Sequence, residues 1–368
     1  MATDLSIKVA HLIRDFRAVR LLAEFIEHEL EKRVVARLGL IKIEALNAVA
    51  SAYKNEIKRK ATPDKAAIRD LESLLTRLRV DLEGGIRDAR NAQVGHSLGL
   101  PVERIPEHWL FMGHSTFTIL EQDLGRIDAA LRTLDSGYFG AQPIPALDPK
   151  LRDSWSAPKA LGPANAIRTA LVYAGPWTPD VISLMPGSTT FQDASLRVMG
   201  LRLMLRQLGF LIVPFWQAGH TVSVWERLML ELSIIDFFAL EEAVFDGNVR
   251  GGTPSLVAEW SAGKPPHKGV AALQAARAGL NVARIGWRDN VRNKVCAHMD
   301  QDVPASMLDV ANWPLSPVDL FAEIERLCGM VGSAARLDAR TKHMTGPTLT
   351  CGSAQQIAGA HAPRWQDI

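Results

Sequence analysis

Residues 85–96 read GIRDARNAQVGH, and a version of the same phrase returns at residues 286–298 as GWRDNVRNKVCAH. Both versions begin with Gly, an apolar residue, Arg and Asp, and both then carry Arg-Asn, four further residues and His. The second version holds one extra residue, and the four spacer residues differ completely between the two. A repeat of this kind indicates a duplicated unit. Because only the polar residues are shared, the pattern favours function over packing.

Helical periodicity surrounds the first copy. From Leu5 to Ile26 apolar residues recur at spacings of three and four, which predicts an amphipathic helix. Similar patterns span about 41–57, 66–89 and 109–134, and Asp64 supplies an N-cap before the third. Residues 1–136 are therefore predicted to form a four-helix domain, with the first motif at the end of its third helix.

A proline-rich stretch follows this domain. Between Pro143 and Pro186 the chain carries eight prolines, and such a density breaks helices. We assign residues 137–193 to a linker. Two short β-like runs, Thr169–Tyr173 and Val181–Met185, suggest a small hairpin within it.

The helical pattern then repeats. Segments near 196–216, 222–245, 269–288 and 317–337 have helical spacing, and the second motif again ends the third segment. Residues 194–340 are predicted to form a second helical domain, and residues 341–368 a loosely held tail. The predicted fold class is all-α, with two tandem four-helix bundles joined by the proline-rich linker.

Bulk composition excludes several classes of protein. A net charge of +2 over 368 residues does not give the basic coat of a histone-like protein, so any nucleic-acid contact is local. The three cysteines are odd in number and lack Cys-x2-Cys spacing, which argues against a disulfide framework and a structural zinc site. The N-terminus lacks an apolar signal core, and no apolar run suits a membrane span. These features predict a cytoplasmic protein.

The repeated residues suit attack on a phosphodiester. Histidine titrates near neutrality and can both take and give a proton, while arginine offers a cationic fork that fits phosphate oxygens. In RNA the 2′-OH supplies the nucleophile. Six steps along a regular helix leave Arg and His roughly 120° apart. Either the helix ends between them, or residues of the two copies combine.

The leading arginines add a second feature. Arg87 is three residues before Arg90, and Arg288 is four before Arg292, so each pair shares a helix face. Each motif then presents a small basic ridge, and we assign Arg87 and Arg288 to RNA binding. A solvated helix surface is the simpler alternative for both.

With these motifs the chain resembles the HEPN superfamily of helical ribonuclease domains, whose hallmark is an Arg, usually followed by a polar residue, with a His four to six residues further on. The resemblance implies two domains packed about a pseudo-two-fold axis, with both motifs in one composite site. It implies metal-independent RNA cleavage, with no cofactor, that leaves a 2′,3′-cyclic phosphate and a 5′-OH. Members recur in abortive-infection phage defence and among toxins, which implies an antitoxin or activating partner.

Carried over residue by residue, the resemblance assigns three roles. Arg90 and Arg292 bind and stabilise the scissile phosphate. His96 and His298 act as acid, base or positioning groups. Asn91 and Asn293 orient them. Two copies on one chain allow an intramolecular site, and the long linker also allows exchange in a homodimer.

Two other interpretations remain open. One is a catalytically silent HEPN pair that binds RNA or protein. The other is an unrelated helical scaffold with an accidental repeat. Single residues also have plainer explanations: Trp287 as a packing indole, Cys296 as a small space-filler, and Lys58, Arg59 and Lys60 as cations at a helix C-terminus.

Overall fold

The computed structural model describes residues 3–25, 29–60, 64–81, 114–144, 224–246, 254–278, 286–297, 299, 302–313 and 317–339. These residues are mainly helical, and no strand occurs among them. The all-α prediction is thus confirmed for the described part of the chain. The suggested hairpin and the tail at residues 341–368 lie outside it. No helix in this part is long and apolar enough to cross a membrane.

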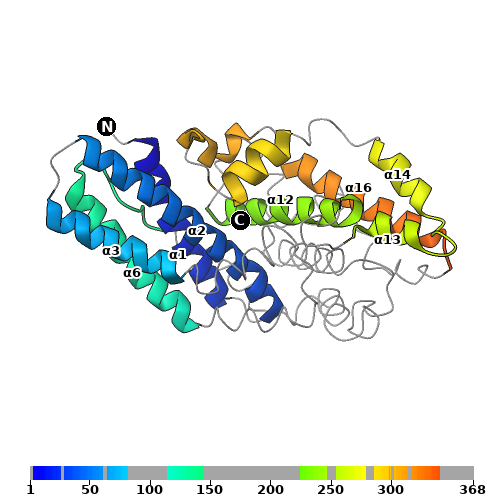
Figure 1. Cartoon of the computed structure of the whole chain (residues 1–368), viewed down its shortest axis with the longest axis horizontal. Coiled ribbons are helices and arrows are strands. Elements are labelled where there is room, and N and C mark those ends of the chain that lie inside the picture. The colour runs from blue at the N-terminus through cyan, green and yellow to red at the C-terminus, as the bar shows by residue number, and fades with distance from the viewer. Residues whose placement is uncertain are drawn as a thin grey trace, which may run out of the picture. The chain divides into compact units, whose positions relative to one another are not determined.

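The chain divides into two compact units. The first holds the helices α1 (Asp4–Phe25), α2 (Glu29–Lys60), α3 (Lys65–Asp81) and α6 (His114–Leu134). In this unit α1 packs against α2 and α6, and α3 packs against α6 and α2 (Figure 1). The four described helices therefore close a ring of contacts, with the first helix beside the second and the fourth.

The predicted apolar stripe of α1 forms part of this core. Its described members are almost fully buried: Val9, Leu12, Ile13, Phe16 and Val19. The helix begins with a reciprocal cap, in which the Thr3 Oγ1 accepts from the Ser6 amide at 3.3 Å and the Ser6 Oγ accepts from the Thr3 amide at 2.9 Å. At α3 the predicted N-cap is confirmed, because Asp64 Oδ1 accepts from the Ala66 amide at 2.8 Å.

Polar contacts fix the chain where it leaves α6. The Tyr53 hydroxyl donates to Asp135 at 2.6 Å, and the Tyr138 hydroxyl donates to Asp128 at 2.7 Å. Burial and the neighbouring carboxylates raise the pKa of both tyrosines, so each remains a donor. Gly140 follows with φ +78°, a conformation that favours glycine, and a Cβ there would overlap the Arg132 guanidinium. These contacts fix the backbone conformation of residues 138–142.

The second unit contains α12 (Val224–Phe245), α13 (Leu256–Ala262), α14 (Val270–Ala278) and α16 (Pro317–Arg336). Here α12 packs against α13 and α16, and α14 packs against α13 and α16 (Figure 1). The pattern of neighbours equals that of the first unit, although α13 and α14 are much shorter than α2 and α3. The apolar side chains of α12 form part of the core of this unit: Leu228, Leu230, Ile234, Ile235, Phe237 and Phe238 are buried.

A stacked pair closes one end of this second unit. The rings of Trp260 and His267 lie 3.7 Å apart between centroids, and both residues are buried. His267 Nδ1 accepts from the Gly269 amide at 2.9 Å. At Gly269 the backbone comes so close to α16 that a Cβ would overlap the carbonyl of Ala334. The connection between α13 and α14 therefore packs directly on α16.

Glu259 in α13 gives the second unit a pH-dependent stability. Burial raises the pKa of its carboxyl from 4.5 to about 7, against the opposing pull of the helix N-terminus. The folded state thus binds the proton more tightly than the unfolded chain, and stability falls as pH rises from about 4.5 to 7. Glu259→Gln is expected to stabilise the protein at pH 8 by about 1–2 kcal/mol, discounted for partial exposure, and to change little at pH 4.

Urea unfolding of both proteins at the two pH values checks this expectation. Glu72→Gln is the control of opposite sign, because hydrogen bonds from Lys58 and Lys54 lower the pKa of Glu72. Equal unfolding free energies of Glu259→Gln and the wild type at both pH values would show that the Glu259 carboxylate is well solvated.

Candidate functional site

The structure describes only part of the predicted site. Arg87, Arg90, Asn91 and His96 of the first motif lie outside the described residues, as does His298. Arg288 and Asn293 fall within a described helix, but their side chains are not described. Arg292 is described fully and is 4% exposed. Which of these side chains come together therefore stays a prediction.

The second motif lies on a helix. A π-helix, η6, spans Trp287–Ala297, and the helix α14 spans Val270–Ala278. The sequence predicted one helix running from 269 into the motif, and residues 279–285 of that stretch lie outside the described residues. In a π-helix each backbone amide donates to the carbonyl five residues back. Such turns are rare in proteins, and many of those that occur lie at functional sites. It ends one residue before His298, and Met299 follows with φ 48°.

The buried face of η6 carries the motif arginine. Trp287, Val291 and Val295 are buried at a constant spacing of four, and Arg292 and Cys296 lie beside them on the same face. Trp287 and Cys296 are packing residues here, as their simpler interpretation predicted.

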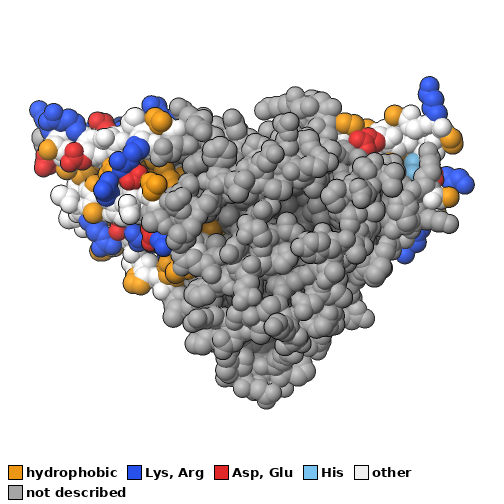
Figure 2. All heavy atoms as spheres, turned by 90° about the horizontal axis from the view of Figure 1, so that it is seen from below, with side chains coloured by type: hydrophobic (Ala, Val, Ile, Leu, Met, Phe, Trp, Pro, Cys, Tyr) orange, Lys and Arg blue, Asp and Glu red, His pale blue; other side chains and the backbone are white. Residues whose placement is uncertain are grey.

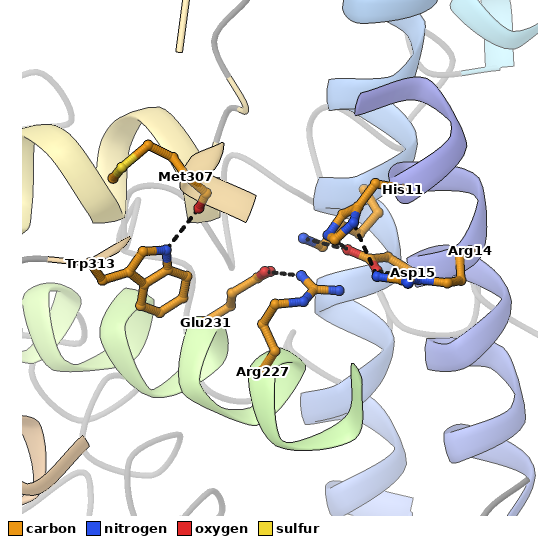
Figure 3. Close-up of polar contacts among 8 residues, drawn as sticks. His11, Arg14, Asp15, Arg227, Glu231, Met307 and Trp313 are labelled. Carbon is orange, nitrogen blue, oxygen red and sulfur yellow. Dashed lines mark hydrogen bonds and ion pairs between the residues drawn. The ribbon is translucent and has the colours of Figure 1, made fainter. Parts of the chain in front are cut away.

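The segment after η6 packs with the N-terminal helices. The division between the two units falls inside η6, and Asp289–Trp313 groups with α1, α2, α3 and α6. The short 3-10 helix η7 (Ala305–Leu308) contacts α1, and the Ala305 amide donates to Asp4 at 3.3 Å. The Trp313 indole donates to the Met307 carbonyl at 2.9 Å and braces the loop (Figure 3). The chain that carries Arg292 therefore belongs to the same unit as the first four helices.

A charged cluster lies on the buried side of α1. Asp15 is fully buried, and the Lys42 ammonium of α2 lies 3.2 Å from its Oδ2. His11 Nε2 faces the same oxygen at 3.5 Å, and Arg14 Nε lies 3.9 Å from Oδ1 (Figure 3). Buried charges persist in proteins when they are paired. This charged cluster was not predicted from the sequence. Its signal there was a carboxylate on the apolar stripe of α1, between Leu12 and Phe16.

Arg14 also contacts the second ring nitrogen of His11. The Arg14 guanidinium lies 3.0 Å from His11 Nδ1. Because arginine can only donate, Nδ1 is the acceptor in this contact. Arg14 and Lys42 are thus two cations beside the carboxylate of Asp15.

A pocket of about 220 Å³ opens next to this cluster. One wall is the face of α1 from Ser6 to Arg14, and the other is the chain at Phe139, Gly140 and Gln142. His11 and Arg14 are 12% and 25% exposed at the side chain, whereas Asp15 is fully enclosed. The pocket thus presents Arg14 and His11, with Asp15 and Lys42 behind them.

The described residues do not meet the requirements of a metal site. No group of three or more His, Cys, Asp or Glu residues in the described ranges could hold a metal ion. In the view of Figure 2, Lys and Arg side chains are mixed with Asp and Glu side chains over the coloured part of the surface. Several cations among the described residues are paired, such as Lys58 with Glu72 and Lys60 with Glu56.

Comparison with known proteins adds no assignment. No family model, curated protein or solved structure matches the chain.

Proposed function

We propose that the chain is a metal-independent endoribonuclease whose site combines the two Arg-Asn-x4-His motifs of a tandem HEPN-like pair. The single observation that carries the proposal is the repeat itself, at 90–96 and 292–298. In sequence, the first motif lies between α3 and α6, and the second lies between α14 and α16. The equal pattern of helix neighbours in the two units supports the duplication.

Grouping of the second motif with the first four helices supports a composite site. Asp289–Trp313 groups with the N-terminal helices, so this unit contains residues from both halves of the chain. A monomer can then supply both motifs to one RNA. The linker between the halves allows the same pairing between two copies of the chain.

In the proposed reaction the RNA supplies its own nucleophile. The 2′-oxygen attacks the adjacent phosphorus while the bond to the 5′-oxygen breaks. One motif histidine takes the proton of the 2′-OH, and the other gives a proton to the leaving 5′-oxygen. Arg90 and Arg292 stabilise the charge on the phosphoryl oxygens. The products are a 2′,3′-cyclic phosphate and a 5′-OH, and the step conserves every atom without a co-reactant. A role in phage defence or as a toxin fits this activity.

Cleavage of labelled single-stranded RNA and transfer RNA in EDTA tests the proposal. We expect the wild type to give cyclic-phosphate ends, and His96→Ala and His298→Ala each to lower the rate by about 10²–10⁴-fold. Loss in either single variant indicates one shared site, whereas two independent sites would leave about half of the activity. Lys294→Ala, an exposed cation on η6, is the matched control. Cleavage by the double histidine variant at the wild-type rate would refute the proposal.

A second candidate function is a catalytically silent pair that binds RNA or a protein. The burial of Arg292 favours it, because a buried guanidinium contributes to packing rather than to phosphate binding. The same variants distinguish the two functions. Undetectable cleavage by the wild type, together with RNA binding that is equal in His96→Ala and His298→Ala, would favour the silent module.

A further inference from the structure

A second ligand site lies in the N-terminal unit, at the pocket between α1 and residues 139–142. We infer that this pocket binds one nucleotide unit, with the base beside Phe139 and the phosphate at Arg14. The inference stands on this pocket alone and goes beyond the proposed ribonuclease, because the described residues that line the pocket belong to neither motif.

The pocket has the size of one small ligand. Its volume of about 220 Å³ lies below the roughly 300–1,000 Å³ of sites for drug-sized molecules. A single planar ring with its phosphate at the mouth suits this space, and an oligonucleotide can place only one residue in it.

The walls suit a planar base. Phe139 lines the pocket and is 70% exposed, so its ring is accessible to a ligand. Ile7 and Ala10 of α1 also line it. Flipped or unpaired bases are held between aromatic and apolar side chains in this way, with polar groups at their edges. Gln142, which is exposed at the rim, can both donate to and accept from a base edge.

The polar end suits a phosphate. Arg14 lines the pocket as a permanent cation, and its fork matches phosphate oxygens. The hydrogen bond to His11 Nδ1 orients the guanidinium. Lys42 lies 3.2 Å from Asp15 and so offsets the negative charge of that carboxylate near the pocket.

The wall opposite α1 is built before any ligand arrives. Tyr138 is anchored on Asp128, and the Ala141 amide donates to the same carboxylate at 3.1 Å. These two bonds flank Phe139 and Gly140 and hold the ring at the mouth of the pocket. A preformed aromatic wall loses little conformational entropy on binding.

Titration calorimetry on the full chain tests the inference. The probes are adenosine and uridine monophosphates, inorganic phosphate, and a single-stranded RNA hexamer. We expect a monophosphate or the hexamer to bind, and Phe139→Ala and Arg14→Gln each to weaken that binding by about tenfold or more, from the usual energies of base stacking and charged hydrogen bonds. Ile119→Ala and Arg59→Gln, which change exposed residues away from the pocket, are the matched controls.

The probes separate the sources of the nucleotide. Binding of a free monophosphate supports a small regulatory ligand, and binding of the hexamer alone supports an RNA residue as the occupant. Binding of phosphate as tight as that of every nucleotide would overturn the base-binding part. Equal affinity of the wild type and Phe139→Ala, an exposed change that does not threaten folding, would overturn the whole inference. RNA cleavage in the histidine variants is scored separately, so the two proposals can fail independently.

Discussion

Asp15→Ala is expected to lower the free energy of unfolding of the N-terminal unit by about 3–5 kcal/mol. The substitution removes the carboxylate that lies 3.2 Å from the ammonium of Lys42, and Lys42 is 1% exposed. A buried cation that loses its counter-charge keeps the cost of leaving water and gains nothing in return. The same carboxylate faces His11 and Arg14, so the arrangement of the pocket wall should loosen as well.

Urea unfolding followed by circular dichroism, with hydrogen exchange of the α1 and α2 amides, measures this loss. Asp70→Ala, an exposed carboxylate on α3, is the matched control and should cost less than about 0.5 kcal/mol. The double variant Asp15→Leu with Lys42→Met should recover most of the loss, because it removes both charges. A loss below about 1 kcal/mol in Asp15→Ala would mean that water reaches the cluster.

Trp260→Ala is expected to destabilise the second unit by about 3–5 kcal/mol. Trp260 is 2% exposed, and its loss empties the space between α13 and the connection to α14. It also removes the ring on which His267 stacks. Because His267 holds the Gly269 amide, the start of α14 should loosen with it.

Hydrogen exchange resolves this effect by helix. Amides of α13 and α14 should exchange faster in Trp260→Ala, whereas those of α1 and α2 should keep wild-type protection. Trp260→Phe, which keeps an aromatic ring, should cost less than half as much in unfolding free energy. Uniform loss of protection in both units would show that the two unfold as one body.

Local sequence signals predicted most of the described helices. The apolar stripe of α1 and the N-cap at Asp64 were both found where the pattern placed them. α13 was missed, since seven residues are too few for a helical period to register over the usual window. The helix predicted from 269 into the second motif is described at both ends, as α14 and η6, and residues 279–285 between them lie outside the described residues.

The sequence by itself determined the helical class, the positions of the long helices and the repeat of the Arg-Asn-x4-His motif, because periodicity and spacing are properties of neighbouring residues. Only the tertiary structure decided that Asp289–Trp313 packs with α1 and that Arg292 is buried. It also joined Asp15 to Lys42, and Arg14 to a wall that carries Phe139 more than a hundred residues later. Contacts at such separations depend on how helices pack, and the pairing of buried charges depends on which faces meet.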